Sequence, residues 1–180
     1  MSKFDDFYRI FGEDAGQQIC YYSKEHSTEV GDGWLKDKYF WQFIPKGSPV
    51  KTGAYMVPNY IIVSNSYTKC PDGAKGTAMD CVKTLYSNSK HLPWCEHFIV
   101  DDKEVWQINP DNEIIVHPDI EEADIYYTES VMISFCFYEG CDEDALANNL
   151  VTLTSLIAGR YGIPAENIVT LEIGLDETTE

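Results

Sequence analysis

Residues 96–105 read EHFIVDDKEV, and this stretch predicts a β-hairpin. Three apolar residues at 98–100 are followed by a polar turn, Asp101–Lys103, and a second apolar run extends from Val105 to Ile108. Short apolar runs on both sides of a polar turn are typical of two antiparallel strands. The stretch therefore predicts a sheet, and the segments on either side of it indicate the fold class.

Strand and helix patterns alternate around this hairpin. Residues 142–162 carry the clearest helical signal, because Asp142 can cap the first turn, apolar residues recur at helical spacing, and Gly162 and Pro164 end the pattern. The other predicted elements are strands at 60–63, 114–116, 130–138 and 168–173 and a helix at 77–88. This alternation predicts an α/β fold with a mixed central β-sheet flanked by helices.

The first 55 residues differ from the rest by their aromatic content. Residues 3–11 predict a short helix with an aromatic face, and the run YFWQFI at 39–44 predicts a strand that Pro45 ends. From Met56 onward the pattern becomes regular. We therefore predict an aromatic-rich N-terminal extension, residues 1–55, followed by an α/β domain, residues 56–180.

The order of these elements resembles the zinc-dependent N-acetylmuramoyl-L-alanine amidases, a family that includes phage lysozyme-type amidases and peptidoglycan-recognition proteins. Residues 96–105 are similar to the family's Tyr-His-Phe hairpin, and residues 58–66, PNYIIVSNS, are similar to its first strand, which ends in a metal-binding histidine. Residues 130–140 and 153–169 are similar to a later strand and to the last helix with its following segment. The resemblance covers residues 57–173 and implies an amidase-like fold.

The resemblance also implies a zinc ion held by two histidines and a cysteine or aspartate, with an open position that activates water. In this sequence Ser64 occupies the first histidine position, the second falls near Leu171 or Glu172, and Glu96 replaces the tyrosine. Acidic residues alone remain for the third ligand: Asp176, Glu177 and Glu180. We therefore predict a relative that has not retained the metal ligands, with no catalytic residue, no metal and no cofactor.

Two other chemistries remain open near the hairpin. His91, Cys95 and His97 have possible metal-ligand spacing, with Cys70 or Cys81 as a fourth donor. Cys95 and His97 would also lie on the same face of a strand, as a thiol nucleophile and its base would. The resemblance implies a structural role for His97.

Charge is distributed very unevenly along the chain. Residues 1–100 hold 11 acidic and 11 basic side chains, whereas residues 101–180 hold 19 acidic ones against Lys103 and Arg160. The second part therefore carries the whole formal net charge of −17. Such a surface repels nucleic acid and anionic wall polymers and attracts basic protein surfaces, although acidic surfaces also serve solubility.

From these features we predict a non-catalytic, acidic, amidase-like protein that binds a basic protein partner. The concrete version is a phage or mobile-element inhibitor of a nucleic-acid enzyme, of the anti-CRISPR type. The predicted partner-binding residues are acidic and lie in two groups: Asp119, Glu121, Glu122 and Asp124 in a loop, and Glu139, Asp142, Glu143 and Asp144 at the start of the last helix.

Two alternatives belong to other functional classes. One is an amidase that binds or cleaves peptidoglycan, with Trp34, Trp41, Trp94 and Trp106 as stacking faces for sugars. The other is a structural component of a virion that docks through residues 1–55.

The sequence also bears on location. Its start, MSKFDD, has no apolar signal region, and no run approaches the ~18 apolar residues of a membrane span. We therefore predict a cytoplasmic protein with reduced cysteines, without membrane or direct nucleic-acid contacts.

Overall fold

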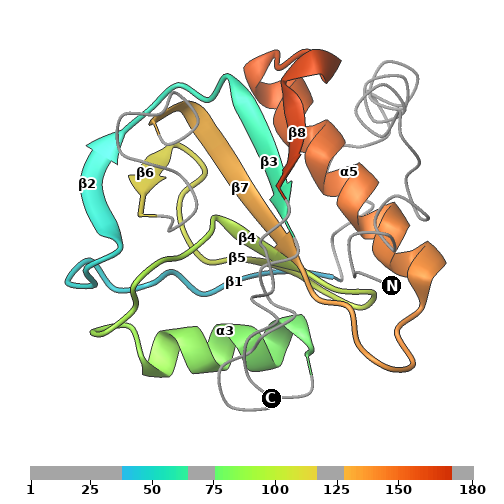
Figure 1. Ribbon diagram of the computed structural model, residues 1–180, viewed down its shortest axis with the longest axis horizontal. Helices are drawn as coiled ribbons and strands as arrows, with labels where there is room; N and C mark the ends of the chain where they lie inside the picture. The colour runs from blue at the N-terminus through green and yellow to red at the C-terminus, as the bar shows by residue number, and fades with distance from the viewer. Residues whose placement is uncertain (1–37, 65–75, 117–127, 172–180) are drawn as a thin grey trace, which may run out of the picture.

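A six-stranded mixed sheet forms the centre of the computed structural model, which describes residues 38–64, 76–116 and 128–171 (Figure 1). The strand order is β1-β5-β4-β7-β3-β8. The strands are β1 (Tyr39–Trp41), β3 (Tyr60–Ser64), β4 (Phe98–Val100), β5 (Val105–Gln107), β7 (Ser130–Phe135) and β8 (Ile168–Leu171). Only β4 and β5 pair antiparallel in this sheet, and they form the predicted hairpin.

Of the described helices, α5 and α3 cover opposite faces of the sheet (Figure 1). Helix α5 (Glu143–Tyr161) packs on alternate strand residues such as Ile61, Val131 and Ile133. Helix α3 (Ala78–Ser87) packs on the opposite face, against Ile99 and Cys136. All six residues of β7 are buried because the strand lies at the centre of a sheet that is covered on both sides. The predicted α/β class with a mixed central sheet is confirmed.

Helix α5 begins and ends where its sequence predicts. The Asp142 side chain accepts a hydrogen bond of 3.0 Å from the Ala145 N–H, which has no partner inside the helix. Glu143 and Asp144 lie in the first turn, where the helix dipole favours negative charge. Gly162 ends the helix in the left-handed conformation, with φ of 68°. A single 3-10 turn, Ala165–Asn167, then leads into β8.

We expect Asp142→Ala to lower the free energy of unfolding by about 1 kcal/mol, because the Ala145 N–H loses its capping partner. Asp144→Ala is the matched control, since it removes an exposed carboxylate from the same turn without removing the cap. Urea unfolding of the two variants measures the difference. Equal losses in both would show that the dipole, and not the capping bond, matters here.

Residues from the predicted N-terminal extension also contribute strands. β1 pairs in parallel with β5, and β2 (Lys51–Tyr55) pairs with β6 (Glu113–Ile115) in a separate two-stranded antiparallel sheet. The sequence predicts the strands at 39–44 and 114–116, but it did not indicate β2. The helix predicted at 3–11 lies outside the described residues, and the boundary at residue 55 stays a prediction.

Asp101, which directly follows β4, links the start of α3 to the hairpin turn through hydrogen bonds. One of its carboxylate oxygens accepts from the Ala78 N–H at 2.8 Å, and the other accepts from the N–H groups of Lys103 and Glu104. Just before the helix, Gly76 has φ of 64°, and a Cβ there would lie 3.1 Å from the Cβ of Tyr138. The helix therefore starts from a closely packed point at the carboxyl ends of β4 and β7. Within the described residues, no helix is long and apolar enough to cross a membrane.

Candidate functional site

The candidate site lies at the carboxyl ends of β3 and β7, two neighbouring parallel strands. Ser64 ends β3, and the strand register places it opposite Ser134 of β7. On its other side, Ser64 pairs through the backbone with Leu171 of β8. Carboxyl ends of parallel strands are the usual place for sites in open α/β sheets. The sequence resemblance assigns Ser64 to this same place.

A buried carboxylate completes a chain of hydrogen bonds at these strand ends. The Ser134 Oγ donates to Glu96 Oε1 at 2.9 Å, and the hydroxyl oxygens of Ser64 and Ser134 lie 2.9 Å apart. Because the single hydroxyl hydrogen of Ser134 goes to Glu96, Ser64 is the donor in the serine pair. Ser64 is 3% exposed, and the other two are fully buried. These three buried residues lie together at the carboxyl ends of β3 and β7, and we call them the polar floor.

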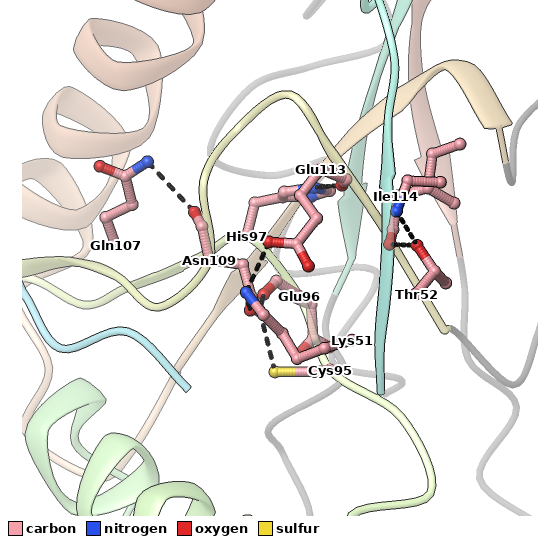
Figure 2. A network of polar contacts seen from close by, with 10 residues as sticks. Lys51, Thr52, Cys95, Glu96, His97, Gln107, Asn109, Glu113 and Ile114 are labelled. Atoms are coloured by element: carbon pink, nitrogen blue, oxygen red, sulfur yellow. Dashed lines mark hydrogen bonds and ion pairs between the residues drawn. The ribbon is translucent and has the colours of Figure 1, made fainter. Parts of the chain in front are cut away.

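The segment that carries Glu96 is held by a second network (Figure 2). Asn109 Nδ2 donates to the Glu96 carbonyl oxygen at 2.5 Å and to Cys95 Sγ at 3.3 Å. Lys51 of β2 donates to Asn109 Oδ1 at 3.0 Å and forms an ion pair of 2.6 Å with Glu113 of β6. The side chains of Lys51 and Glu113 are 5% and 7% exposed. The small second sheet therefore fixes the position of Glu96 through Asn109.

His97 is engaged at both ring nitrogens. Nδ1 accepts from the Met132 N–H at 2.9 Å, so Nε2 carries the hydrogen and donates to the Glu113 carbonyl oxygen at 2.7 Å. Burial lowers the pKa of His97 to about 4, since the charged ring would lose its water. The ring is therefore neutral near pH 7 and joins β7 to the start of β6, which is the structural role that the resemblance implies.

These contacts argue against both other chemistries near the hairpin. Burial raises the pKa of the Cys95 thiol far above its usual range, and the nearby Glu96 charge raises it further, so the thiolate that a nucleophile needs is disfavoured. His97 has no free nitrogen for a metal or a proton transfer. His91 is exposed, whereas Cys95 and His97 are fully buried. Across residues 38–64, 76–116 and 128–171, no three His, Cys, Asp or Glu side chains form a group that could hold a metal.

The described part of the site does not fit the zinc ion that the family resemblance implies. Zinc sites in proteins use imidazole nitrogen, thiolate or carboxylate ligands. The sequence resemblance places the Ser64 hydroxyl at the first ligand position, and this hydroxyl donates its hydrogen to Ser134. Glu172, Asp176, Glu177 and Glu180 lie outside the described residues.

The eight predicted partner-binding acids fall into two sets. Asp119, Glu121, Glu122 and Asp124 lie outside the described residues. Glu139 is exposed in the turn after β7, and Asp142, Glu143 and Asp144 begin α5. The helix start explains three of these acids locally, through capping and the dipole. Partner binding by the acids stays a prediction.

Ser134 is the site residue that sequence reasoning missed. It lies inside the apolar run VMISFC, and its partner Glu96 is 38 positions away. The available signal was a hydroxyl in the centre of a strand predicted to be buried, since buried polar groups need hydrogen-bond partners.

Solved structures with a similar fold include a catalytic domain and an endolysin. The catalytic domain of XlyA has 26% sequence identity and a TM-score of 0.64, covering 74% of this chain and 83% of that one. A mutant endolysin from Bacillus subtilis has 24% identity and a TM-score of 0.62, covering 74% and 82%. An AmpD derivative has 20% identity and a TM-score of 0.50, covering 77% and 83%. No protein-family model and no curated protein matches the sequence.

These likenesses contradict the prediction of an acidic inhibitor of a nucleic-acid enzyme and favour the peptidoglycan alternative. The prediction was wrong because it drew a specific partner from net charge, which describes a whole surface and designates no site. The similar structures establish the fold of this protein. The chain has the fold of the N-acetylmuramoyl-L-alanine amidase catalytic domains.

Proposed function

We propose that this chain binds peptidoglycan at the carboxyl ends of β3 and β7 and does not hydrolyse it by the zinc mechanism. The observation that carries the proposal is the likeness to the XlyA catalytic domain over 74% of the chain. Ser64 supports the second part, since a serine hydroxyl bonded to Ser134 replaces the family's first histidine.

The polar floor supports a binding role of a particular kind. Ser64, Ser134 and Glu96 are joined by hydrogen bonds and are almost fully buried, so their role at the end of the sheet is to shape it. A satisfied buried network is rigid.

The test is co-sedimentation with purified cell-wall sacculi, combined with an assay for newly released amino groups. We expect the chain to sediment with sacculi and to release no amino groups, with or without added Zn²⁺. Release that EDTA abolishes would instead identify an active amidase. A chain that stays in the supernatant and releases nothing would contradict the proposal altogether.

Charge gives this experiment an internal control. The formal net charge of −17 should repel the anionic polymers attached to native walls. Binding should therefore increase when these polymers are stripped from the sacculi, and also when salt is raised from ~10 to ~150 mM, because salt screens the repulsion. Binding that falls steeply with salt would point to attraction between charges and not to recognition of the wall polymer.

A further inference from the structure

A groove of 250 Å³ lies between α3 and the edge of the sheet formed by β1 and β5. Its helix wall consists of Met79, Val82, Lys83 and Tyr86, which share one face of α3 because they are three or four positions apart. The facing wall includes Trp106 of β5 and Gln42, which directly follows β1. In strand order β4 and β7 lie between β5 and β3, so this groove is separate from the floor at Ser64.

On the sheet side, the aromatic lining of the groove is Trp106, and Phe40 packs against its ring. Phe40 of β1 stacks on Trp106, with ring centroids 5.0 Å apart and an interplanar angle of 26°. Glu104 accepts a hydrogen bond of 2.7 Å from the indole N–H of Trp106, which fixes the ring. Across the groove Tyr86 is 43% exposed. Two aromatic side chains, Trp106 and Tyr86, therefore line opposite sides of the groove.

Polar groups complete the lining. Gln42 has an amide, Ser87 a hydroxyl and Lys83 an ammonium group, all beside the aromatic rings. A sugar ring has apolar C–H faces and a hydroxyl edge, so it can place a face on an aromatic ring while its edge forms hydrogen bonds. Lys83 adds a positive charge, which complements the muramic acid carboxylates that are free only on glycan strands without stem peptides.

We propose that this groove binds the glycan strand of peptidoglycan, a polymer of N-acetylated hexosamines. The proposal rests on the proposed function, because peptidoglycan supplies the strand. It adds a second contact on the α3 face, so that the chain holds the polymer at two places. Phe40, which stacks on the Trp106 ring, comes from β1 within the first 55 residues.

The experiment titrates the full chain with a hexamer of N-acetylglucosamine and follows tryptophan fluorescence and heat. We expect binding, and Tyr86→Ala should weaken it at least about tenfold, since one accessible aromatic contact of this kind contributes roughly that much. Tyr55→Ala is the matched control, because Tyr55 is 70% exposed on β2 and does not line the groove. It should leave the affinity unchanged.

A second probe tests the role of the charge. Lys83→Gln should leave binding of the neutral hexamer unchanged but weaken binding of a glycan fragment that contains muramic acid carboxylates. Unchanged affinity of Tyr86→Ala for both probes would overturn the proposal, as would binding of a free stem peptide in place of the sugars. Self-association that Tyr86→Ala abolishes would also overturn it, since a second copy would then occupy the groove.

The outcomes separate this proposal from the proposed function. If the parent chain and Tyr86→Ala bind sacculi equally and neither binds the hexamer, the proposal for the groove is wrong. The proposed function would then still stand. If the chain binds neither sacculi nor the hexamer, both the proposed function and the proposal for the groove are wrong.

Discussion

Replacing Glu113 with alanine is expected to lower the free energy of unfolding by about 3–5 kcal/mol. The carboxylate forms a 2.6 Å ion pair with Lys51, and both side chains are almost fully buried. Without Glu113, the ammonium group keeps, among the described residues, the Asn109 oxygen at 3.0 Å as its partner. A buried charge that has lost its counter-ion is far more costly than a broken surface pair, which contributes about 0–1 kcal/mol.

Urea denaturation measures this loss, since urea does not screen charge as guanidinium would. The double variant Lys51→Met/Glu113→Leu is the control. It removes both charges and keeps similar volumes, and we expect it to recover most of the lost stability. A loss below about 1 kcal/mol in Glu113→Ala would mean that water reaches the pair in solution.

Lowering the pH from about 6.5 to 4 is expected to remove about 3 kcal/mol of stability through His97 alone, as the shift of its pKa to about 4 implies. The folded pKa lies below the ordinary value of 6.5, because burial disfavours the charged ring. The unfolded chain therefore binds a proton in this range while the folded chain does not. The contribution is fully present above pH 6.5, decreases as the pH falls, and levels off below about 4.

Carboxylates also titrate near the lower end of this range, so the experiment compares variants. Urea unfolding from pH 7 to 4.5 should show a steeper decline for the parent chain than for His97→Gln, which has no ring to protonate. His91→Gln, at an exposed position, should behave like the parent. The imidazole proton signals offer a direct check, because a His97 signal that shifts near pH 6.5 would refute the low pKa.

The sequence predicts those parts of the fold that depend on neighbours along the chain. The hairpin of β4 and β5 is local, and α5 has its cap, apolar spacing and terminal glycine within one continuous segment. In contrast, β2 reads KTGAY, is mostly exposed and pairs with a strand about 60 positions later. No local sequence signal indicates such a strand, because its pairing with β6 is what stabilises it.

The candidate site divides in the same way. Ser64 and Glu96 were located singly through the family resemblance, yet the hydrogen bonds that join them pass through Ser134. That connection depends on the register between β3 and β7, which brings together residues 70 positions apart. The Lys51–Glu113 pair, 62 positions apart, was missed for the same reason. Sequence similarity points to positions, whereas strand register determines which of them touch.

The pairing of β1 with β5 affects how the protein can be shortened. Gln42 and Ile44 donate backbone hydrogen bonds of 2.9 Å to Gln107 and Ile108, and Val105 donates one of 2.8 Å to Lys38. A fragment starting at residue 56 would leave this side of β5 without its partner. Such a bare edge recruits strands from other molecules and leads to aggregation. Fragments for crystallisation or binding studies should therefore begin before residue 38, so that the edge of the sheet stays covered.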